Sequence, residues 1–256
     1  MNNLMNIDFN KLNRPFTIKI VLMLVILVIL VIYISYVANY SLYYKNMNHM
    51  ISPILIPDVS DATRGYTDLI TTNLFRDRIY DNLRHNNTNF SISMWIYIKD
   101  WKYNYDFNKI LFNKYFVNND KRFYSPIIYL DKYNNKLIYQ AHIYDKDSNN
   151  PKLVKCEYDN IPIQSWVNIV FSIEDKTVNL YINGSLVKKC NFESIGYQGQ
   201  DYQLEILPKG KGIVDDNNKD GDGLNGFSGN ISKLQYISKT LNFSEIRKIY
   251  ENGPYN

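Results

Sequence analysis

The chain has 256 residues, with 29 Lys and Arg against 25 Asp and Glu, and 45% of its residues are hydrophobic. A net charge of +4 is too small and too scattered for a nucleic-acid-binding surface, so we expect no nucleic-acid partner. The 23 tyrosines exclude a disordered chain, and the two cysteines exclude a disulfide-rich miniprotein. The length allows one large domain with attachments.

Residues 20–38 form an uncharged apolar run, IVLMLVILVILVIYISYVA. As a helix it is about 28 Å long, which matches the hydrocarbon core of a bilayer. The run ends in tyrosines, so it predicts a retained transmembrane helix in contact with lipid rather than a cleaved signal peptide. A buried core helix of this length rarely lacks a polar face. Lys11, Arg14 and Lys19 precede the run and only Lys45 closely follows it, which favours a single-pass protein with a cytosolic N-terminus and its domain on the opposite face.

The rest of the chain divides at about residue 88. A short tail covers residues 1–19, and residues 39–87 are expected to form a stalk with room for one early strand. From Phe90, hydrophobic residues alternate in FSISMWIYI (90–98), as in a half-buried strand. Similar runs follow at 109–116, 125–131, 136–144, 152–158, 166–174, 177–184, 185–190, 202–207 and 227–237.

The turns between these runs favour antiparallel pairing. Asn183-Gly184 supplies the positive φ angles of a type I′ hairpin turn, and Glu174-Asp175-Lys176 separates the two preceding runs. A closing helix is expected after Asn242 as N-cap, with Glu245 three residues later. About ten strands of this length predict an all-β fold, a two-sheet antiparallel sandwich.

Three stretches carry a family resemblance: FSISMWIYIKDW, then CEYDNIPIQSWVNIVFSIEDKTVNLYINGSLVKKC, then GFSGNISKLQYISKTLNFSEI. In this order they resemble the laminin G-like, concanavalin A-like lectin superfamily, above all its single-pass, membrane-anchored versions in large DNA viruses and some protists. The resemblance covers residues 88–252 and implies a jelly-roll sandwich. Because this fold hosts lectins, receptor-binding modules, structural modules and hydrolases, it does not by itself select a function.

No catalytic residues are predicted. Glycosidases of this fold carry carboxylates spaced E-x-D-x-x-E. The nearest match is Glu157-Tyr158-Asp159, in which the third position is Pro162. The three histidines, His49, His85 and His142, lack metal-ligand spacing.

An acidic stretch offers a candidate calcium site. Asp216, Asn218, Asp220 and Asp222 place oxygen ligands at alternate positions, a rhythm that suits calcium. Position twelve of an EF-hand loop would be Phe227 rather than Glu, so a plain solvated loop stays as the alternative. Any calcium affinity is expected to be weak.

Aromatic residues follow the first long strand. Trp101, Tyr103 and Tyr105 in WKYNYDF form a candidate ligand-binding platform, because aromatic faces stack on flat partners such as sugar rings. The alternative is that tyrosine simply replaces phenylalanine in a Tyr-rich chain. Cys156 and Cys190 each lie near a strand end, and either pair in a disulfide or stay as two buried thiols.

These observations predict a membrane-anchored, non-enzymatic laminin G-like module that binds a glycan or a protein surface. The alternative is a structural protein of a virion envelope or inner membrane that does not bind carbohydrate. An array of glycans separates these hypotheses, because a structural module gives no saturable sugar binding.

Overall fold

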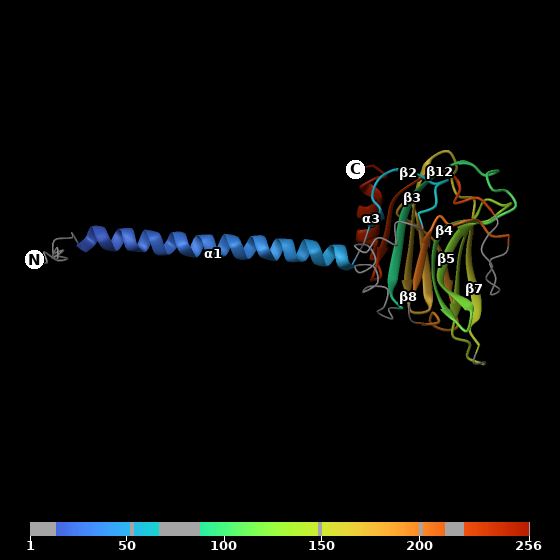
Figure 1. Cartoon of the computed structure of the whole chain (residues 1–256), viewed down its shortest axis with the longest axis horizontal. Coiled ribbons are helices and arrows are strands. Elements are labelled where there is room, and N and C mark those ends of the chain that lie inside the picture. Colours follow the sequence, from blue (N-terminus) through green and yellow to red (C-terminus); the bar gives the residue numbers. More distant parts are fainter. Residues whose placement is uncertain are drawn as a thin grey trace, which may run out of the picture. The chain divides into compact units, whose positions relative to one another are not determined.

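A computed structural model describes residues 14–51, 54–66, 88–147, 150–199, 202–212 and 223–255. The chain divides into two compact units, Met1–Asn48 and His49–Asn256. The first unit contains most of helix α1 (Arg14–Ile51). The second is a β sandwich followed by the short helix α3 (Phe243–Glu251), as Figure 1 shows.

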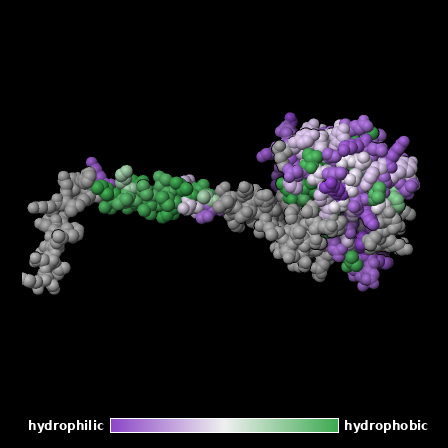
Figure 2. Space-filling view, turned by 45° about the horizontal axis from the view of Figure 1, so that its top comes forward, coloured by the Kyte–Doolittle hydropathy of each residue, from purple (hydrophilic) through white to green (hydrophobic). Residues whose placement is uncertain are grey.

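Helix α1 is apolar on all sides over its central part. The stretch Lys19–Asn39 is long and apolar enough to cross a membrane, and every side chain in it is exposed. Figure 2 shows this stretch as a continuous hydrophobic surface. Pro15 lies in the first turn, where a missing amide hydrogen costs no helical bond, and the helix ends just before Ser52-Pro53.

The sandwich consists of two sheets in which every strand pair is antiparallel. The seven-stranded sheet has the order β1-β12-β3-β8-β9-β10, with β2 also paired to β12, and the five-stranded sheet has the order β11-β4-β5-β6-β7. The strands are β1 (Ile54–Ile56), β2 (Ser60–Asp61), β3 (Phe90–Asp100), β4 (Lys109–Asn118), β5 (Lys121–Leu130), β6 (Lys136–Ile143), β7 (Lys152–Asp159), β8 (Trp166–Glu174), β9 (Thr177–Ile182), β10 (Ser185–Asn191), β11 (Gln203–Ile206) and β12 (Ser228–Ile237). This arrangement confirms the predicted all-β, jelly-roll sandwich.

Hydrophobic alternation explains the main core, which lies between the sheets. Ile92, Met94 and Ile96 of β3 are completely buried there, and Tyr139 of β6 meets Phe171 of β8 across the sandwich. Burial of this apolar surface is the main force that holds the sheets together. A second cluster lies on the opposite face of the five-stranded sheet: Ile110, Tyr115, Tyr124, Ile127, Tyr129 and Ile138.

The predicted turns and cap have the expected backbone geometry. Asn183 and Gly184 both adopt positive φ angles, 50° and 76°, between β9 and β10. Asn242 and Glu245 form a reciprocal capping box at the start of α3. Ile246 of α3 then packs in a third apolar cluster with residues of β8 and β12.

The sandwich includes part of the segment expected to form a stalk. Both β1 and β2 lie within residues 39–87 and pair with β12. Leu55 and Ile56 belong to the main core, with 4% and 2% of their surface exposed. An apolar triplet is too short to show alternation, and its partner β12 lies near the other end of the chain.

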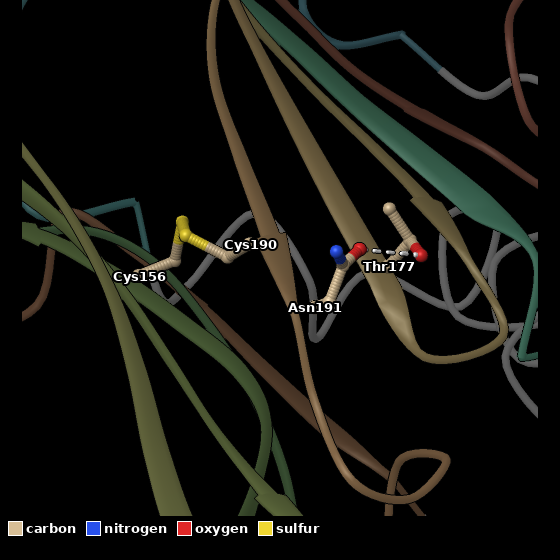
Figure 3. The surroundings of a disulfide bond; sticks show 4 residues. All are labelled: Cys156, Thr177, Cys190 and Asn191. Carbon is tan, nitrogen blue, oxygen red and sulfur yellow. Dashed lines mark hydrogen bonds between the residues drawn. A yellow bond between two sulfur atoms is a disulfide. The ribbon is translucent and has the colours of Figure 1, made fainter.

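A disulfide joins the two sheets at one edge. Cys156 of β7 and Cys190 of β10 are bonded, with a Cα–Cα distance of 5.9 Å (Figure 3). Each strand is the last in its sheet. The bond therefore closes the sandwich on the side where neither edge strand has a further β partner.

A lysine lies inside the main core. Lys114 of β4 is 4% exposed, and its Nζ donates a hydrogen bond to the Tyr236 hydroxyl of β12 at 3.2 Å. The same Nζ lies 4.4 Å from the ring centroid of Tyr202 and 5.3 Å from that of Phe90. Burial lowers the pKa of Lys114 to about 7.

Candidate functional site

Three loops come together at the end of the sandwich where β3 ends, and we call them the rim. They are residues 101–108 between β3 and β4, residues 131–135 between β5 and β6, and residues 223–227 before β12. The Asn104 side-chain amide donates to the Leu224 carbonyl at 2.7 Å, and the Lys132 amide donates to the Asn108 side chain at 3.1 Å. These bonds connect segments that lie far apart in the sequence.

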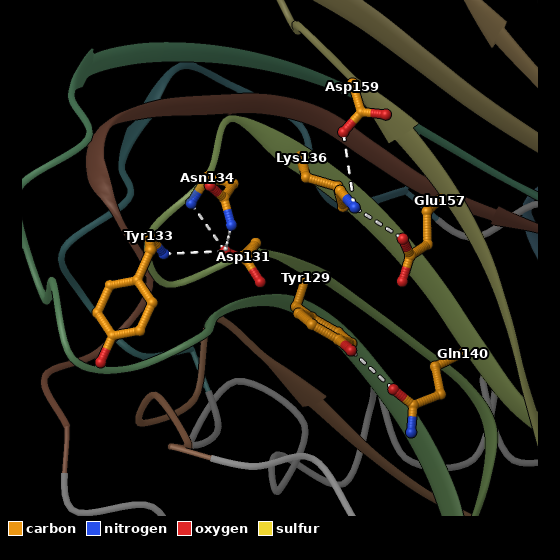
Figure 4. A network of polar contacts seen from close by, with 8 residues as sticks. All are labelled: Tyr129, Asp131, Tyr133, Asn134, Lys136, Gln140, Glu157 and Asp159. Atoms are coloured by element: carbon orange, nitrogen blue, oxygen red, sulfur yellow. Dashed lines mark hydrogen bonds and ion pairs between the residues drawn. The ribbon is translucent and has the colours of Figure 1, made fainter.

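Two exposed tyrosines lie side by side on the rim. The rings of Tyr105 and Tyr133 have centroids 5.0 Å apart, and 51% and 47% of the two residues is exposed. The Asp131 carboxylate accepts hydrogen bonds from the amides of Tyr133 and Asn134, at 2.9 and 2.8 Å, which fixes the turn (Figure 4). The Lys132 Nζ lies 4.7 Å from the Tyr133 ring centroid. The pair thus forms an exposed aromatic surface, one ring of which lies on a fixed turn.

A charged network borders this turn. The Lys136 Nζ lies 2.8 Å from a Glu157 oxygen and 3.6 Å from an Asp159 oxygen (Figure 4). The hydrogen bond to Glu157, followed by the charge of that residue, raises the pKa of Lys136. Beneath it, the Tyr129 hydroxyl donates to Gln140 at 2.7 Å, and burial raises the pKa of that hydroxyl.

This arrangement offers both apolar and polar contacts to a ligand. The two exposed rings provide an apolar surface, and the neighbouring lysine, carboxylates and amides provide hydrogen bonds. Glu157 and Asp159 are the carboxylates nearest to the glycosidase pattern, and both form an ion pair with Lys136.

The structure places the three aromatic residues of the predicted platform in different surroundings. Trp101 is half-buried against the main core, with the Lys109 Nζ 5.5 Å from its ring centroid. Tyr103 is also half-buried, its hydroxyl donates to the Asn225 carbonyl at 3.1 Å, and burial raises its pKa. Tyr105 is the exposed member of the three.

Tyr133, the neighbour of Tyr105, was not among the residues predicted from the sequence. Its signal was an aromatic residue in the polar turn DKYNN between two alternating runs. That turn predicts exposure but not the partner, because Tyr105 belongs to another loop.

The other predicted site residues fall into two groups. Asp216, Asn218, Asp220 and Asp222 lie outside the described residues. Within the described ranges, no group of three or more His, Cys, Asp or Glu side chains is placed to hold a metal ion. The two cysteines, at 156 and 190, are bonded to each other.

The solved structures that match this chain include binding domains of botulinum neurotoxins. The receptor-binding domain of mosaic serotype C/D is 16% identical, with a TM-score of 0.47, and the match covers 68% of this chain and 38% of that one. The binding domain of serotype G is 20% identical, with a TM-score of 0.43, covering 65% and 37%. This chain therefore spans well under half of those chains. No curated protein matches it.

A laminin G family model, described as the concanavalin A-like lectin/glucanases superfamily, matches residues 77–247. The match covers more than half of the chain and includes β3 through β12. It agrees with the two antiparallel sheets described above and with the resemblance carried by the sequence motifs. The chain therefore belongs to the concanavalin A-like lectin/glucanase superfamily.

Proposed function

We propose that this protein is a membrane-anchored, non-enzymatic binding module whose rim contacts a glycan or a protein surface. The observation that carries this proposal is the exposed Tyr105–Tyr133 pair, whose Tyr133 lies on a fixed turn bordered by charged and amide groups. Aromatic faces of this kind stack on the apolar faces of sugar rings and act as anchors in protein interfaces.

The apolar part of α1 supports the anchoring role. At about 1.5 Å per residue, the 21 residues Lys19–Asn39 are roughly 32 Å long, enough to cross a bilayer. The excess of cations before this stretch favours a cytosolic N-terminus, with the sandwich on the other side.

The topology of the sandwich supports display of the rim. Strand β1, the first after the helix, pairs Ile54 with Gln235, whereas the rim lies where Ser228 of β12 pairs with Asp100 of β3. The chain thus enters the sheet towards one end of β12, and the rim lies at the other.

The binding role is tested with the full-length chain in neutral detergent micelles on an array of immobilised oligosaccharides. We expect saturable binding that falls at least tenfold in the Tyr105→Ala/Tyr133→Ala variant, a loss of about 1.4 kcal/mol. The matched control is Tyr144→Ala, because Tyr144 is 39% exposed and has its own ring contact with Tyr197. Equal loss in the control would contradict the role of the rim. Absence of any saturable binding would favour the structural alternative.

The orientation is tested by protease protection in sealed vesicles. We expect the sandwich to resist protease added from the cytosolic side and to be digested once the vesicles are opened. Digestion before opening would show that the proposed orientation is wrong.

A further inference from the structure

The chain contains triplets of the kind that accept an N-linked oligosaccharide. The acceptor pattern is Asn-x-Ser/Thr, in which x is any residue except proline. Asparagine is abundant in this chain, so some of these triplets arise by chance, and exposure in the folded protein has to distinguish them. In chain order they begin at Asn39, Asn86, Asn89, Asn183, Asn230 and Asn242. Of these, Asn86 lies outside the described residues.

Most of the described triplets are poor acceptors because of where they lie. Asn39 is the last residue of the apolar stretch of α1, so a bilayer around that stretch would border it. Asn89 and Asn230 are half-buried, and the serine two positions after each of them is completely buried. Asn183 is half-buried in the turn between β9 and β10, and its side chain accepts a hydrogen bond from the Asn168 amide at 2.9 Å. An oligosaccharide on any of the last three would crowd the surrounding strands.

The triplet at the start of α3 is different. Both Asn242 and Ser244 are exposed. The Asn242 Oδ1 accepts a hydrogen bond from the Glu245 amide at 3.0 Å, whereas its Nδ2 has no hydrogen-bond partner within the described part of the chain. The nitrogen that would carry a sugar is therefore free, and a different atom of the same side chain caps the helix.

We propose that Asn242 is an N-glycosylation site. Its Nδ2 attacks the anomeric carbon of an oligosaccharide carried on a membrane-lipid diphosphate, the donor used by the transferase of the secretory membrane. A bond forms between nitrogen and that carbon, and the bond from the carbon to the phosphate oxygen breaks. The lipid diphosphate leaves with the electron pair of that bond, and the nitrogen loses one proton to solvent. This proposal rests on the proposed orientation, because the transfer takes place on the non-cytosolic side.

The local structure accommodates the modification. The new bond replaces one hydrogen of Nδ2 and leaves Oδ1 to accept from the Glu245 amide, so the capping box persists. Helix α3 has 9 residues, and a helix this short is marginal until it packs, which leaves the triplet accessible to a transferase before folding. The adjacent Phe243 is 60% exposed, and an attached oligosaccharide would shield this apolar ring from water.

The experiment translates the full-length chain in the presence of secretory microsomes and compares its electrophoretic mobility before and after digestion with peptide N-glycosidase. The Asn242→Gln variant should lose one glycan step relative to the wild type. Ser244→Ala should lose the same step although it retains the capping asparagine, and Ser244→Thr should keep it, because the acceptor pattern requires a hydroxyl at this position. Unchanged mobility in Asn242→Gln would overturn the proposal.

A matched control replaces an asparagine outside any acceptor triplet. Asn160 is exposed and is followed by Ile161-Pro162. Asn160→Gln should therefore migrate like the wild type before and after digestion. Loss of a glycan step in this control as well would overturn the assignment to Asn242, because it would show that the change in mobility does not report that residue.

A second variant separates failure of this site from failure of the proposed orientation. Lys121→Thr creates an acceptor triplet that begins at Asn119, in the exposed turn between β4 and β5. It should gain one glycan step. A gain in this variant, together with no step lost in Asn242→Gln, would overturn the site and leave the orientation standing. If neither the wild type nor Lys121→Thr carries a glycan, the sandwich faces the cytosol and both proposals are wrong.

Discussion

The two sheets of the sandwich draw on different parts of the chain. The seven-stranded sheet collects both ends of the domain, with β1 and β2 from its start and β12 from near its end, and α3 packs on it. The five-stranded sheet takes β4 to β7 in uninterrupted order and adds β11 at its edge. One of its turns carries Tyr133, and the loop that leads into β4 carries Tyr105.

The strand next to helix α1 and the exposed aromatic rings therefore belong to different parts of the sandwich. The strand that follows helix α1 belongs to the seven-stranded sheet, whereas Tyr133 lies on a turn of the five-stranded sheet and Tyr105 on the loop that joins the two sheets. The disulfide at the edge and the hydrogen bond of Lys114 in the core each link one sheet to the other. The comparison therefore predicts what is lost when strand β1, the Cys156–Cys190 disulfide or the buried amine of Lys114 is changed on its own.

The largest effect is expected from changes in β1, the first strand after helix α1. Leu55→Ala/Ile56→Ala should lower the free energy of unfolding by about 4 kcal/mol or more, because each truncated core side chain costs about 2 to 5 kcal/mol. Ile54→Ala is the control; this residue is 39% exposed and should cost less than about 1 kcal/mol. Urea denaturation of the full chain, followed by tyrosine and tryptophan fluorescence, measures both changes. If the double variant matches the control, β1 is dispensable and the domain begins near residue 88.

A smaller effect is expected from removal of the disulfide between Cys156 and Cys190. Cys156→Ser/Cys190→Ser should lower the free energy of unfolding by roughly 3 to 4 kcal/mol in the chain-entropy model, since the cysteines are separated by 34 residues. Urea denaturation of the oxidised wild type gives the reference. The wild type in dithiothreitol is the control and should match the double serine variant. A variant as stable as the oxidised wild type would show that packing alone holds the two sheets.

The smallest effect, counted per pH unit, is expected from the buried amine of Lys114. Between pH 7 and 10.5 the unfolded chain keeps the Lys114 proton while the folded chain releases it, since burial lowers the folded pKa to about 7. The free energy of unfolding should therefore rise with pH in this window, by at most about 1.4 kcal/mol per unit.

Lys114→Met tests this dependence. It should stabilise the protein at pH 7 and make the pH profile shallower up to about pH 10. A weaker rise should remain from Lys109, whose pKa burial lowers to about 8. Denaturation curves at several pH values decide the matter, and an unchanged profile would contradict a role for the Lys114 amine.

Local sequence signals predicted most of the strands. The run WVNIVFSIE coincides with β8, and Asn183-Gly184 forms the expected hairpin turn, because alternation and positive φ angles depend on neighbouring residues. The capping box at Asn242 was predicted for the same reason.

Features that depend on distant contacts could not be predicted in this way. Strand β1 is defined by its pairing with β12, and Tyr133 gains its partner from a separate loop. Lys114 alternates with Phe112 and Phe116, two core residues of β4. A charged residue in that position could not be assigned to the core without knowledge of the aromatic rings around it.

The place of β12 in the sheet also constrains how the protein folds as it is made. This strand lies between β1 and β3, so the seven-stranded sheet cannot be completed until the ribosome has released residues 228–237. Until then one edge of β3 has no partner strand, and the apolar residues of β1 stay exposed in the nascent chain. Such long-range pairing slows folding and exposes strand edges to aggregation. Chaperone contact is therefore expected to persist through synthesis of nearly the whole domain.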